Sequence, residues 1–332
     1  MHTPLEIEIS DLQEHPAVRA WEKISPGEFT PVGVVLLKKK NDWSVVFRIQ
    51  GVGRGGHAVI AKRCILATGL VERRIYADIL PQLGISAPDY YGFVKEDEKF
   101  CWIFLQDVSA KRFSPLIEEH QLIAARWLGK MHAIASKILS SGFLPDRGAN
   151  HYLNHLRTAR ATILENFTNR ALKDEDKIIL KKVLSQLTYL ESGWEQIEQF
   201  CSEIPSTLVH GDFRPKNVYV RNRQDGLVLF PLDWELAGWG VPAPDLATAR
   251  GLPSFHQINL HEYWSIISED WPGLDLHTIE RLARVGHVFR RLAAIEWASL
   301  GLAYEWPEKD IGRMNTYQAE LAKTLQTAPW IS

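Results

Sequence analysis

This sequence has few cysteines, no marked excess of charge of either sign and no long apolar run. The three cysteines, Cys64, Cys101 and Cys201, lie far apart and show no metal-ligand spacing. An odd, scattered set argues against a disulfide framework and is typical of a reducing compartment. The 38 basic and 40 acidic residues leave a net charge of -2. This balance gives no support for a nucleic-acid or membrane-surface partner.

Targeting and membrane signals are also missing. The N-terminus, MHTPLEIEISDLQEH, carries acids where a signal peptide would have basic residues and an apolar core. No apolar run approaches the roughly 18 residues needed to cross a bilayer. We therefore expect a cytoplasmic protein that binds neither membrane nor nucleic acid. Its length of 332 residues predicts two domains or one two-lobed fold.

The first third of the sequence is rich in strand-like segments. Branched and aromatic apolar residues, bounded by polar or glycine-containing stretches, are typical of strands. Five strands are predicted, over 32–37, 44–50, 57–64, 90–94 and 101–105. Apolar residues at four-residue steps from Val71 to Leu83 predict one helix over 70–83.

After residue 107 the pattern changes to long segments with helical apolar stripes, one of them formed by Leu282, Val285, Phe289 and Leu292. A short β-like section over 207–232 interrupts these segments. This order predicts an α+β, two-lobed fold. A small antiparallel sheet with one helix forms an N-terminal lobe, 1–106. A larger, mainly helical C-terminal lobe covers 107–332.

A polar loop between two apolar strands contains the strongest motif. In STLVHGDFRPKNVYV, the residues His210, Asp212 and Asn217 have the spacing H-x-D-x-x-x-x-N. A later apolar strand ends on Asp233 in VLFPLDWE. We interpret His210 as a hydrogen-bonded scaffold residue, and Lys216 as a surface residue.

Phosphoryl transfer explains why these residue types occur together. Its transition state is loose, so catalysis depends on positioning the nucleophile and neutralising phosphate charge. A carboxylate at Asp212 orients the attacking hydroxyl and accepts its proton. The carboxylate of Asp233 and the amide oxygen of Asn217 are the oxygen ligands that Mg2+ prefers.

HGDFRPKN resembles the HGD-x-x-x-x-N catalytic loop of the aminoglycoside phosphotransferase and choline kinase superfamily, which shares the protein-kinase fold. LDWE resembles that superfamily's counterpart of the DFG triplet, and LGKMHA over 128–133 resembles its Leu-His-Ala helix end. Glycine at 211, where protein kinases usually carry arginine, favours the small-molecule branch. The stretch GWGVPAPDLA resembles G-x-x-x-x-D-L-A, which implies that Asp245 supports the catalytic loop.

The resemblance implies a magnesium- and ATP-dependent kinase of a small-molecule hydroxyl. Asp212 is then the catalytic carboxylate, and Asn217 and Asp233 hold the metal. Arg214, two residues after Asp212, either stabilises the γ-phosphate or is only a solvated loop charge.

The same resemblance implies that the N-terminal lobe, 1–106, binds the nucleotide and that the C-terminal lobe, 107–332, holds the catalytic and acceptor-binding residues. Lys62 in VIAK is similar to the third-strand lysine that contacts the α- and β-phosphates, with Glu72 as its expected partner. WIFLQDVS resembles the hinge that reads adenine through backbone groups. This implies that Leu105, Gln106 and Asp107 lie against the base.

A glycine-rich stretch, 51–56, matches G-x-G-x-x-G but does not fit a nucleotide loop. The Rossmann interpretation requires a following helix, whereas 57–64 is strand-like. A kinase-like lobe would cover the phosphates with the turn between its first two strands, 38–43, which contains no glycine. We therefore interpret 51–56 as a turn.

The acceptor is not named by the sequence. The superfamily's acceptors include aminoglycosides, macrolides, choline, amino alcohols, sugars and nucleoside antibiotics, so antibiotic resistance is one possible role. Candidate acids for binding ammonium groups are Glu235, Glu269, Asp270 and Asp275. A protein kinase is disfavoured because 233–245 is too short for an activation segment. The remaining alternative is a nucleotide-binding pseudokinase or interaction protein without turnover.

Overall fold

The computed structural model describes residues 12–27, 30–40, 43–138, 142, 144–224, 226–247 and 258–326. The chain divides into two compact units. The first comprises Met1–Arg112 with Asn217–Leu236, and the second comprises Phe113–Lys216 with Ala237–Ser332. The predicted boundary after residue 106 lies near the first division, but the inclusion of Asn217–Leu236 in the first unit was not predicted.

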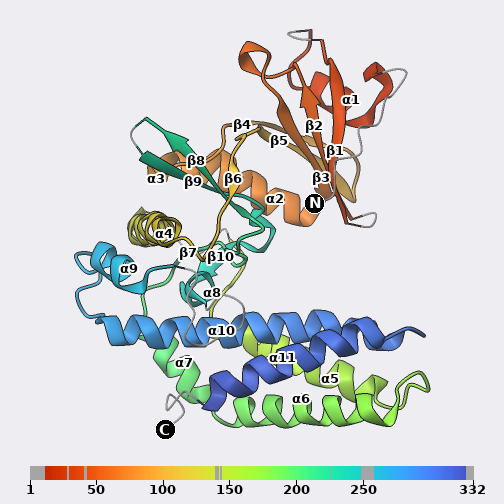
Figure 1. Ribbon diagram of the computed structural model, residues 1–332, viewed down its shortest axis with the longest axis vertical. Coiled ribbons are helices and arrows are strands. Elements are labelled where there is room, and N and C mark those ends of the chain that lie inside the picture. Colours follow the sequence, from red (N-terminus) through yellow and green to blue (C-terminus); the bar gives the residue numbers. More distant parts are fainter. Residues whose placement is uncertain are drawn as a thin grey trace. The chain divides into compact units, whose positions relative to one another are not determined.

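A five-stranded antiparallel sheet, in the order β1-β2-β3-β5-β4, forms the centre of the first unit (Figure 1). Its strands are β1 Gly33–Lys40, β2 Ser44–Gln50, β3 Val59–Ile65, β4 Tyr90–Lys95 and β5 Phe100–Gln106. All five predicted strands are confirmed. The glycine-rich stretch connects β2 to β3, as predicted, and Gly51, Gly55 and Gly56 all have positive φ angles.

One face of this sheet packs against a short helix that was not predicted, α1 Pro16–Glu22. Proline stands at the start of the helix, where its missing N–H is not needed. Val59 and Ala61 of β3 belong to the same buried apolar cluster as Trp21 of α1. The Trp21 ring meets Phe104 edge-on at 5.4 Å between centroids.

The predicted helix over 70–83 is present but is longer and irregular. It comprises α2 Leu66–Arg74, a π-helical turn over Ile75–Ile79, and α3 Leu80–Leu83. The wider π turn adds a residue within the helix. As predicted, Ile75, Ile79 and Leu83 are buried.

A second, three-stranded sheet completes the first unit, in the order β6-β8-β9. Its strands are β6 Lys111–Arg112, β8 Val218–Arg223 and β9 Gly226–Pro231, followed by a 3₁₀ turn over Trp234–Leu236. The amide of Leu232 donates to the carbonyl of Asn217 at 2.8 Å. This hydrogen bond keeps the beginning of β8 beside the end of β9.

Helices dominate the second unit, as predicted. They are α4 Glu118–Ile138, α5 Ala149–Asn166, α6 Asp174–Ser192, α7 Trp194–Ser202, α8 Ala243–Leu246, α9 Leu260–Ile267, α10 Leu276–Ser299 and α11 Glu308–Gln326, with a 3₁₀ turn over Leu300–Ala303. Two short strands, β7 Thr207–Val209 and β10 Gly238–Gly240, pair antiparallel. In Figure 1, α10 lies beside α11 and α5, and these pairs are in contact.

The long helix α10 carries the predicted apolar stripe, because Leu282, Phe289 and Leu292 are fully buried. It also approaches α8 closely. A Cβ added to Gly286 would overlap the carbonyl oxygen of Ala243. Only glycine therefore lets α10 lie directly on the backbone of α8.

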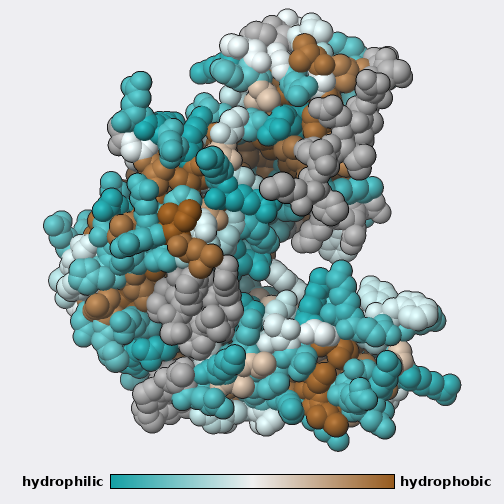
Figure 2. Space-filling view, viewed as in Figure 1, coloured by the Kyte–Doolittle hydropathy of each residue, from teal (hydrophilic) through white to brown (hydrophobic). Residues whose placement is uncertain are grey.

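The exposed surface of the second unit is mixed. Figure 2 shows the hydrophobic residues on its visible face as separate patches among hydrophilic ones. Exposed apolar side chains include Leu164 on α5 and Ile178 and Tyr189 on α6. None of the helices in the described parts of the chain has the length and apolar character needed to span a membrane.

Candidate functional site

Strand β3 turns Lys62 to the face of the sheet opposite α1. Side chains alternate along a strand, and Val59 and Ala61 pack in the cluster that contains α1. Lys62 and Cys64 therefore share the other face, where α2 lies. Lys62 is buried there, which is unusual for a lysine unless it is paired.

A glycine on α2 brings the partner of this lysine into place. A Cβ added to Gly69 would overlap the sulfur of Cys101, so α2 packs directly on β5 at this point. Glu72 follows one helical turn later on the same face. Its carboxylate accepts a hydrogen bond from Lys62, as the sequence predicted.

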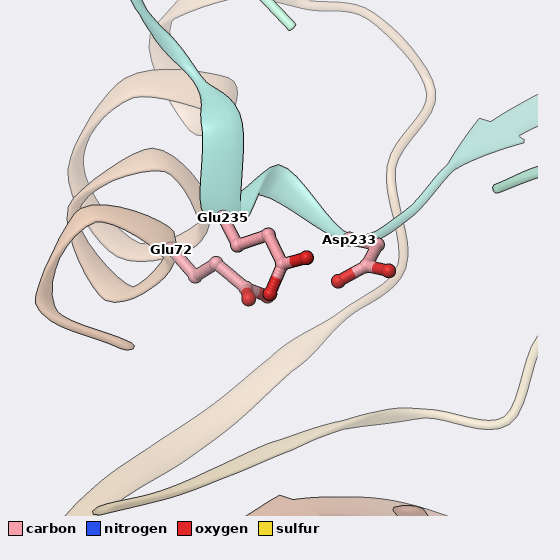
Figure 3. A group of neighbouring side chains, drawn as sticks. All are labelled: Glu72, Asp233 and Glu235. Carbon is pink, nitrogen blue, oxygen red and sulfur yellow. The ribbon is translucent and has the colours of Figure 1, made fainter. Parts of the chain in front are cut away.

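Lys62 also donates to Asp233, with 2.5 Å between Nζ and Oδ1. Lys38 of β1 lies 3.5 Å from the other oxygen of Asp233. Figure 3 shows Glu72, Asp233 and Glu235 with their carboxylates turned toward one another. One oxygen from each of the three lies within 4.8 Å of the others.

Charge and burial act against each other in this cluster. Burial alone would lower the pKa of Lys62, but the carboxylates of Glu72 and Asp233 outweigh it and hold the pKa well above its ordinary value. Burial raises the pKa of Glu72 to about 7, against the opposing effect of Lys62. The ammonium group of Lys62 is therefore permanently charged near neutral pH.

The donor set of this cluster fits a hard cation. Carboxylate oxygens converge there, and Oε2 of Glu72 is buried with no hydrogen-bond partner. Asp233 has a φ angle of 70°, in the left-handed region that non-glycine residues rarely adopt. Asn217 is buried at the start of β8, at the same end of the β8–β9 hairpin. Asn217 and Asp233 are thus both placed in the first unit.

The loop that carries Asp212 belongs to the second unit, and Asp245 fixes its backbone. The carboxylate of Asp245 accepts the amide of His210 at 2.7 Å and that of Gly211 at 2.9 Å. Gly211 has a φ angle of 77°, which glycine adopts without strain. This is the supporting contact that we expected of Asp245.

Asp245 is in turn held by buried polar groups. Nε2 of His132 on α4 lies 3.3 Å from its carboxylate, and Nδ1 of His132 lies 2.9 Å from the hydroxyl of Tyr263 on α9. The hydroxyl of Thr207 donates to the carbonyl of His132 at 2.7 Å. Helices α4, α8 and α9 are therefore linked behind the loop. His210 is buried, and its Nδ1 accepts the amide of Asp212, in keeping with a scaffold role.

Two cations flank the carboxylate of Asp212. Arg214 pairs with one oxygen, and Lys216 lies 2.9 Å from the other. Burial raises the pKa of Asp212, but hydrogen bonds and charge from Arg214 and Lys216 outweigh it, so the pKa is below its ordinary value. Asp212 is consequently ionised at neutral pH.

Comparison with known protein families shows which family contains this chain. The chain matches the model of the phosphotransferase enzyme family, APH, over residues 42–301. The chain belongs to this family. The expected enzyme class, a phosphotransferase acting on a small-molecule hydroxyl, is thereby confirmed. No curated protein matches the chain.

Solved structures similar to this phosphotransferase confirm the kinase-like fold. The aminoglycoside 2'-phosphotransferase IIIa in complex with GDP aligns with a TM-score of 0.61 and 14% identity, over 91% of this chain and 96% of that one. Choline kinase from Cryptosporidium parvum Iowa II aligns with a TM-score of 0.55 and 14% identity, over 92% and 94%. Ethanolamine kinase from Plasmodium vivax aligns with a TM-score of 0.56 and 16% identity, over 92% of this chain and 82% of that one.

The expected adenine-reading segment of this phosphotransferase lies at the end of the sheet. Leu105 and Gln106 are the last residues of β5, and Leu105 pairs with Ile60 on one side and Tyr90 on the other. The side chain of Asp107 accepts a hydrogen bond from Arg48 at 2.6 Å. The side chain of Asp107 thus joins this segment to β2.

Sequence reasoning missed three charged residues in the phosphotransferase. Glu235 joins the carboxylates beside Lys62, although we had grouped it with acceptor-binding acids. Lys216 is exposed, as predicted, yet it pairs with Asp212. Arg290 of α10 lies close enough to Asp212 for the two charges to interact. Glu235 and Lys216 lie within recognised motifs, LDWE and HGDFRPKN, and could have been found from them. Arg290 lies in no such motif.

Proposed function

We propose that this protein transfers the γ-phosphate of ATP to a hydroxyl group of a small molecule, with Mg2+ as cofactor. Membership of the phosphotransferase family supports the reaction class. The residue roles rest on one observation above all. Asp212 is an ionised carboxylate on a loop whose backbone amides are held by Asp245.

In this proposal Asp212 orients the acceptor hydroxyl and accepts its proton. A bond forms between the hydroxyl oxygen and the γ-phosphorus, and the bond from that phosphorus to the ADP oxygen breaks. The proton passes from the hydroxyl to Asp212 and then to solvent. The cations Arg214 and Lys216 keep Asp212 ionised for this role, and we also assign Arg214 to stabilising the transferred phosphate.

The nucleotide is assigned to residues of the first unit. Lys62, oriented by Glu72, binds the nucleotide phosphates, and the backbone at 105–107 binds the base. Asn217 and Asp233 would hold Mg2+, which neutralises phosphate charge when bound. The convergence of carboxylates at Asp233 and the pairing of Lys62 with Glu72 support these assignments.

The choice of ATP follows the nucleotides named for similar structures, with GTP as the competitor. Spectinomycin phosphotransferase, which aligns with a TM-score of 0.59 and 11% identity over 89% of this chain and 94% of that one, is in complex with ADP and its antibiotic. The 2'-phosphotransferase structure holds GDP. Both nucleotides therefore belong in the assay.

A cytoplasmic location is part of the proposal. The sulfurs of Cys64 and Cys101 lie 3.7 Å apart on neighbouring strands, and both cysteines are free. Adjacent thiols remain reduced in a compartment such as the cytoplasm.

The decisive experiment is an acceptor screen with a mass-shift readout. The protein is incubated with Mg2+, ATP or GTP, and a panel of sugars, sugar acids, amino alcohols and aminoglycosides. Each mixture is then searched for the addition of one phosphate. Asp212→Asn should lower the rate at least about 10²-fold, the low end for a positioned general base. Asp174→Asn is the matched control, because Asp174 is exposed in the first turn of α6 and pairs only with Lys177 of the same helix.

The outcomes separate the alternatives. Full activity in Asp212→Asn would show that the catalytic assignment is wrong. Mg2+-dependent nucleotide binding without transfer to any panel member would favour a pseudokinase. Transfer to peptides in place of metabolites would contradict a small-molecule acceptor.

A further inference from the structure

Arg290 of α10 is a half-buried cation that the proposed reaction does not use. Nη1 of its guanidinium is buried and has no hydrogen-bond partner. In the described part of the chain, Arg290 forms neither a salt bridge nor a hydrogen bond. A buried N–H group without a hydrogen-bond partner is costly, so its presence needs an explanation.

The packing of α10 places Arg290 beside the catalytic loop. Gly286 lets α10 lie directly against Ala243 of α8, two residues before Asp245. Arg290 follows Gly286 by four residues and so lies on the same helix face. Its pKa is lowered to about 9 by burial and by repulsion from Arg214, against the attraction of Asp212 and Asp245. The guanidinium is therefore near Asp212, the residue that we propose orients the acceptor hydroxyl.

The nearby carboxylates already have partners. Asp245 accepts two backbone amides and contacts His132, and Asp212 pairs with Arg214 and Lys216. Arg291, the next residue on α10, pairs with Glu320 at 2.6 Å, so that charge is balanced. The region around Asp212 consequently has an excess of cations, with Arg290 as the one without a paired acid among the described residues.

A polycationic acceptor does not fit this charge distribution. Of the acids that we considered as ammonium ligands, Asp270 pairs with Lys137 and Asp275 caps the N-terminus of α10. Glu235 lies in the cluster with Lys62 in the first unit. Each of these three acids is thus already engaged, which leaves only the exposed Glu269 of the four.

We propose that the acceptor carries an anionic group, a carboxylate or a phosphate, which Arg290 binds next to the hydroxyl that Asp212 orients. The inference rests on the proposed function and narrows its acceptor class. A guanidinium presents a planar pair of N–H donors that matches the two oxygens of either group. Binding would give Nη1 of Arg290 the hydrogen bond that it lacks.

Matched acceptor pairs test the proposal. We compare D-gluconate with D-glucitol for the carboxylate, D-glucose 6-phosphate with D-glucose for the phosphate, and kanamycin as a polycation. Transfer is measured as the acceptor-dependent release of ADP. We expect the anionic member of at least one pair to have the higher kcat/KM, by about 10- to 100-fold, as for hydrogen bonds to charged groups. The active pair identifies the anion.

The ratio within the active pair then reports on Arg290. Arg290→Gln should remove the preference by raising KM for the anionic member, whereas Arg290→Lys should keep part of it. Arg284→Gln removes the same charge from α10 and serves as the control, because Arg284 pairs with Glu280 on its own helix. A ratio that is unchanged in Arg290→Gln overturns the proposal, because Arg290 would then not bind the anionic group of the acceptor. Preference for kanamycin also overturns it while leaving the phosphotransferase function intact.

A binding measurement covers the case in which no panel compound is phosphorylated. With ADP and Mg2+ at saturation, sulfate is titrated as an anion probe and the melting temperature is followed. Sulfate should raise the melting temperature of the wild type and of Arg284→Gln. The increase should be much smaller for Arg290→Gln. Equal stabilisation of all three contradicts the anion site. An Arg290-dependent effect without transfer supports the anion site and counts against the proposed function.

Discussion

Nζ of Lys62 and Oδ1 of Asp233 lie 2.5 Å apart, although 171 residues separate them in the chain. The contact joins β3 to the turn that follows β9, within the first unit. It brings the residue assigned to the nucleotide phosphates into direct contact with one assigned to the metal. The same ammonium group also binds Glu72.

Removing Lys62 should therefore affect both stability and nucleotide binding. Breaking a buried ion pair by removing one partner costs about 3–5 kcal/mol. We expect Lys62→Met to lower the free energy of unfolding by about that amount and to abolish measurable ATP binding. Urea unfolding and nucleotide titration measure the two effects.

A double variant separates these effects. Lys62→Met with Glu72→Leu leaves no buried, unpaired carboxylate at position 72, so it should recover much of the stability. It should still fail to bind ATP. Recovery of ATP affinity in the double variant would show that Lys62 has only a structural role.

The pH dependence of the reaction should reflect the cations around Asp212. Its pKa is lowered because Arg214 and Lys216 outweigh the effect of burial. A base with a lowered pKa stays ionised as the pH falls, so the acid limb of kcat/KM should lie at low pH. Arg214→Gln with Lys216→Gln removes both cations, and burial then raises the pKa. The acid limb should move to higher pH, and an unmoved limb would exclude Asp212 as the titrating base.

Two glycines should respond in opposite directions to the same substitution. Gly286→Ala places a methyl group against the carbonyl of Ala243, and we expect it to lower the free energy of unfolding by about 1–3 kcal/mol, as overpacking does. Gly312→Ala on α11 meets no atom within 4 Å and should raise it by about 0.5–1 kcal/mol through helix propensity. Thermal or urea unfolding measures both. Equal responses would contradict the close packing of α10 on α8.

Acid should destabilise the second unit through His287. Burial, aided by Arg291 and Arg290, lowers the pKa of His287 to about 3. Below about pH 6.5 the unfolded chain binds a proton that the folded chain does not. His287 therefore leaves the free energy of unfolding unchanged above pH 6.5. Below that pH it lowers the free energy of unfolding by about 1.4 kcal/mol for each pH unit, until the folded-state pKa is reached.

His287→Gln removes that proton uptake. Between pH 6.5 and pH 5 the wild type should lose about 2 kcal/mol more unfolding free energy than this variant. Urea unfolding of both proteins at several pH values measures the difference. Parallel pH profiles would mean that His287 titrates normally in the folded chain.

Local sequence patterns predicted the parts of the fold that local chemistry determines. The strands of the first sheet and the buried stripe of α10 followed from apolar periodicity, and Lys62, Asp212 and Asp233 followed from motifs. The π turn at Ile75–Ile79 was not predictable, because a one-residue insertion leaves the apolar spacing almost unchanged. Arg290 was missed because its significance depends on the approach of α10 to α8, which only tertiary packing determines.

The attachment of Gly211 and His210 to Asp245 limits how this enzyme can adapt. Their amide hydrogens are bound to a fully buried carboxylate. They should therefore exchange with solvent only when the surrounding helices separate. The backbone at these two residues is therefore fixed by the helices and not by the acceptor. We expect a change of substrate to come from the side chains around the loop, with the backbone at His210 and Gly211 kept as it is.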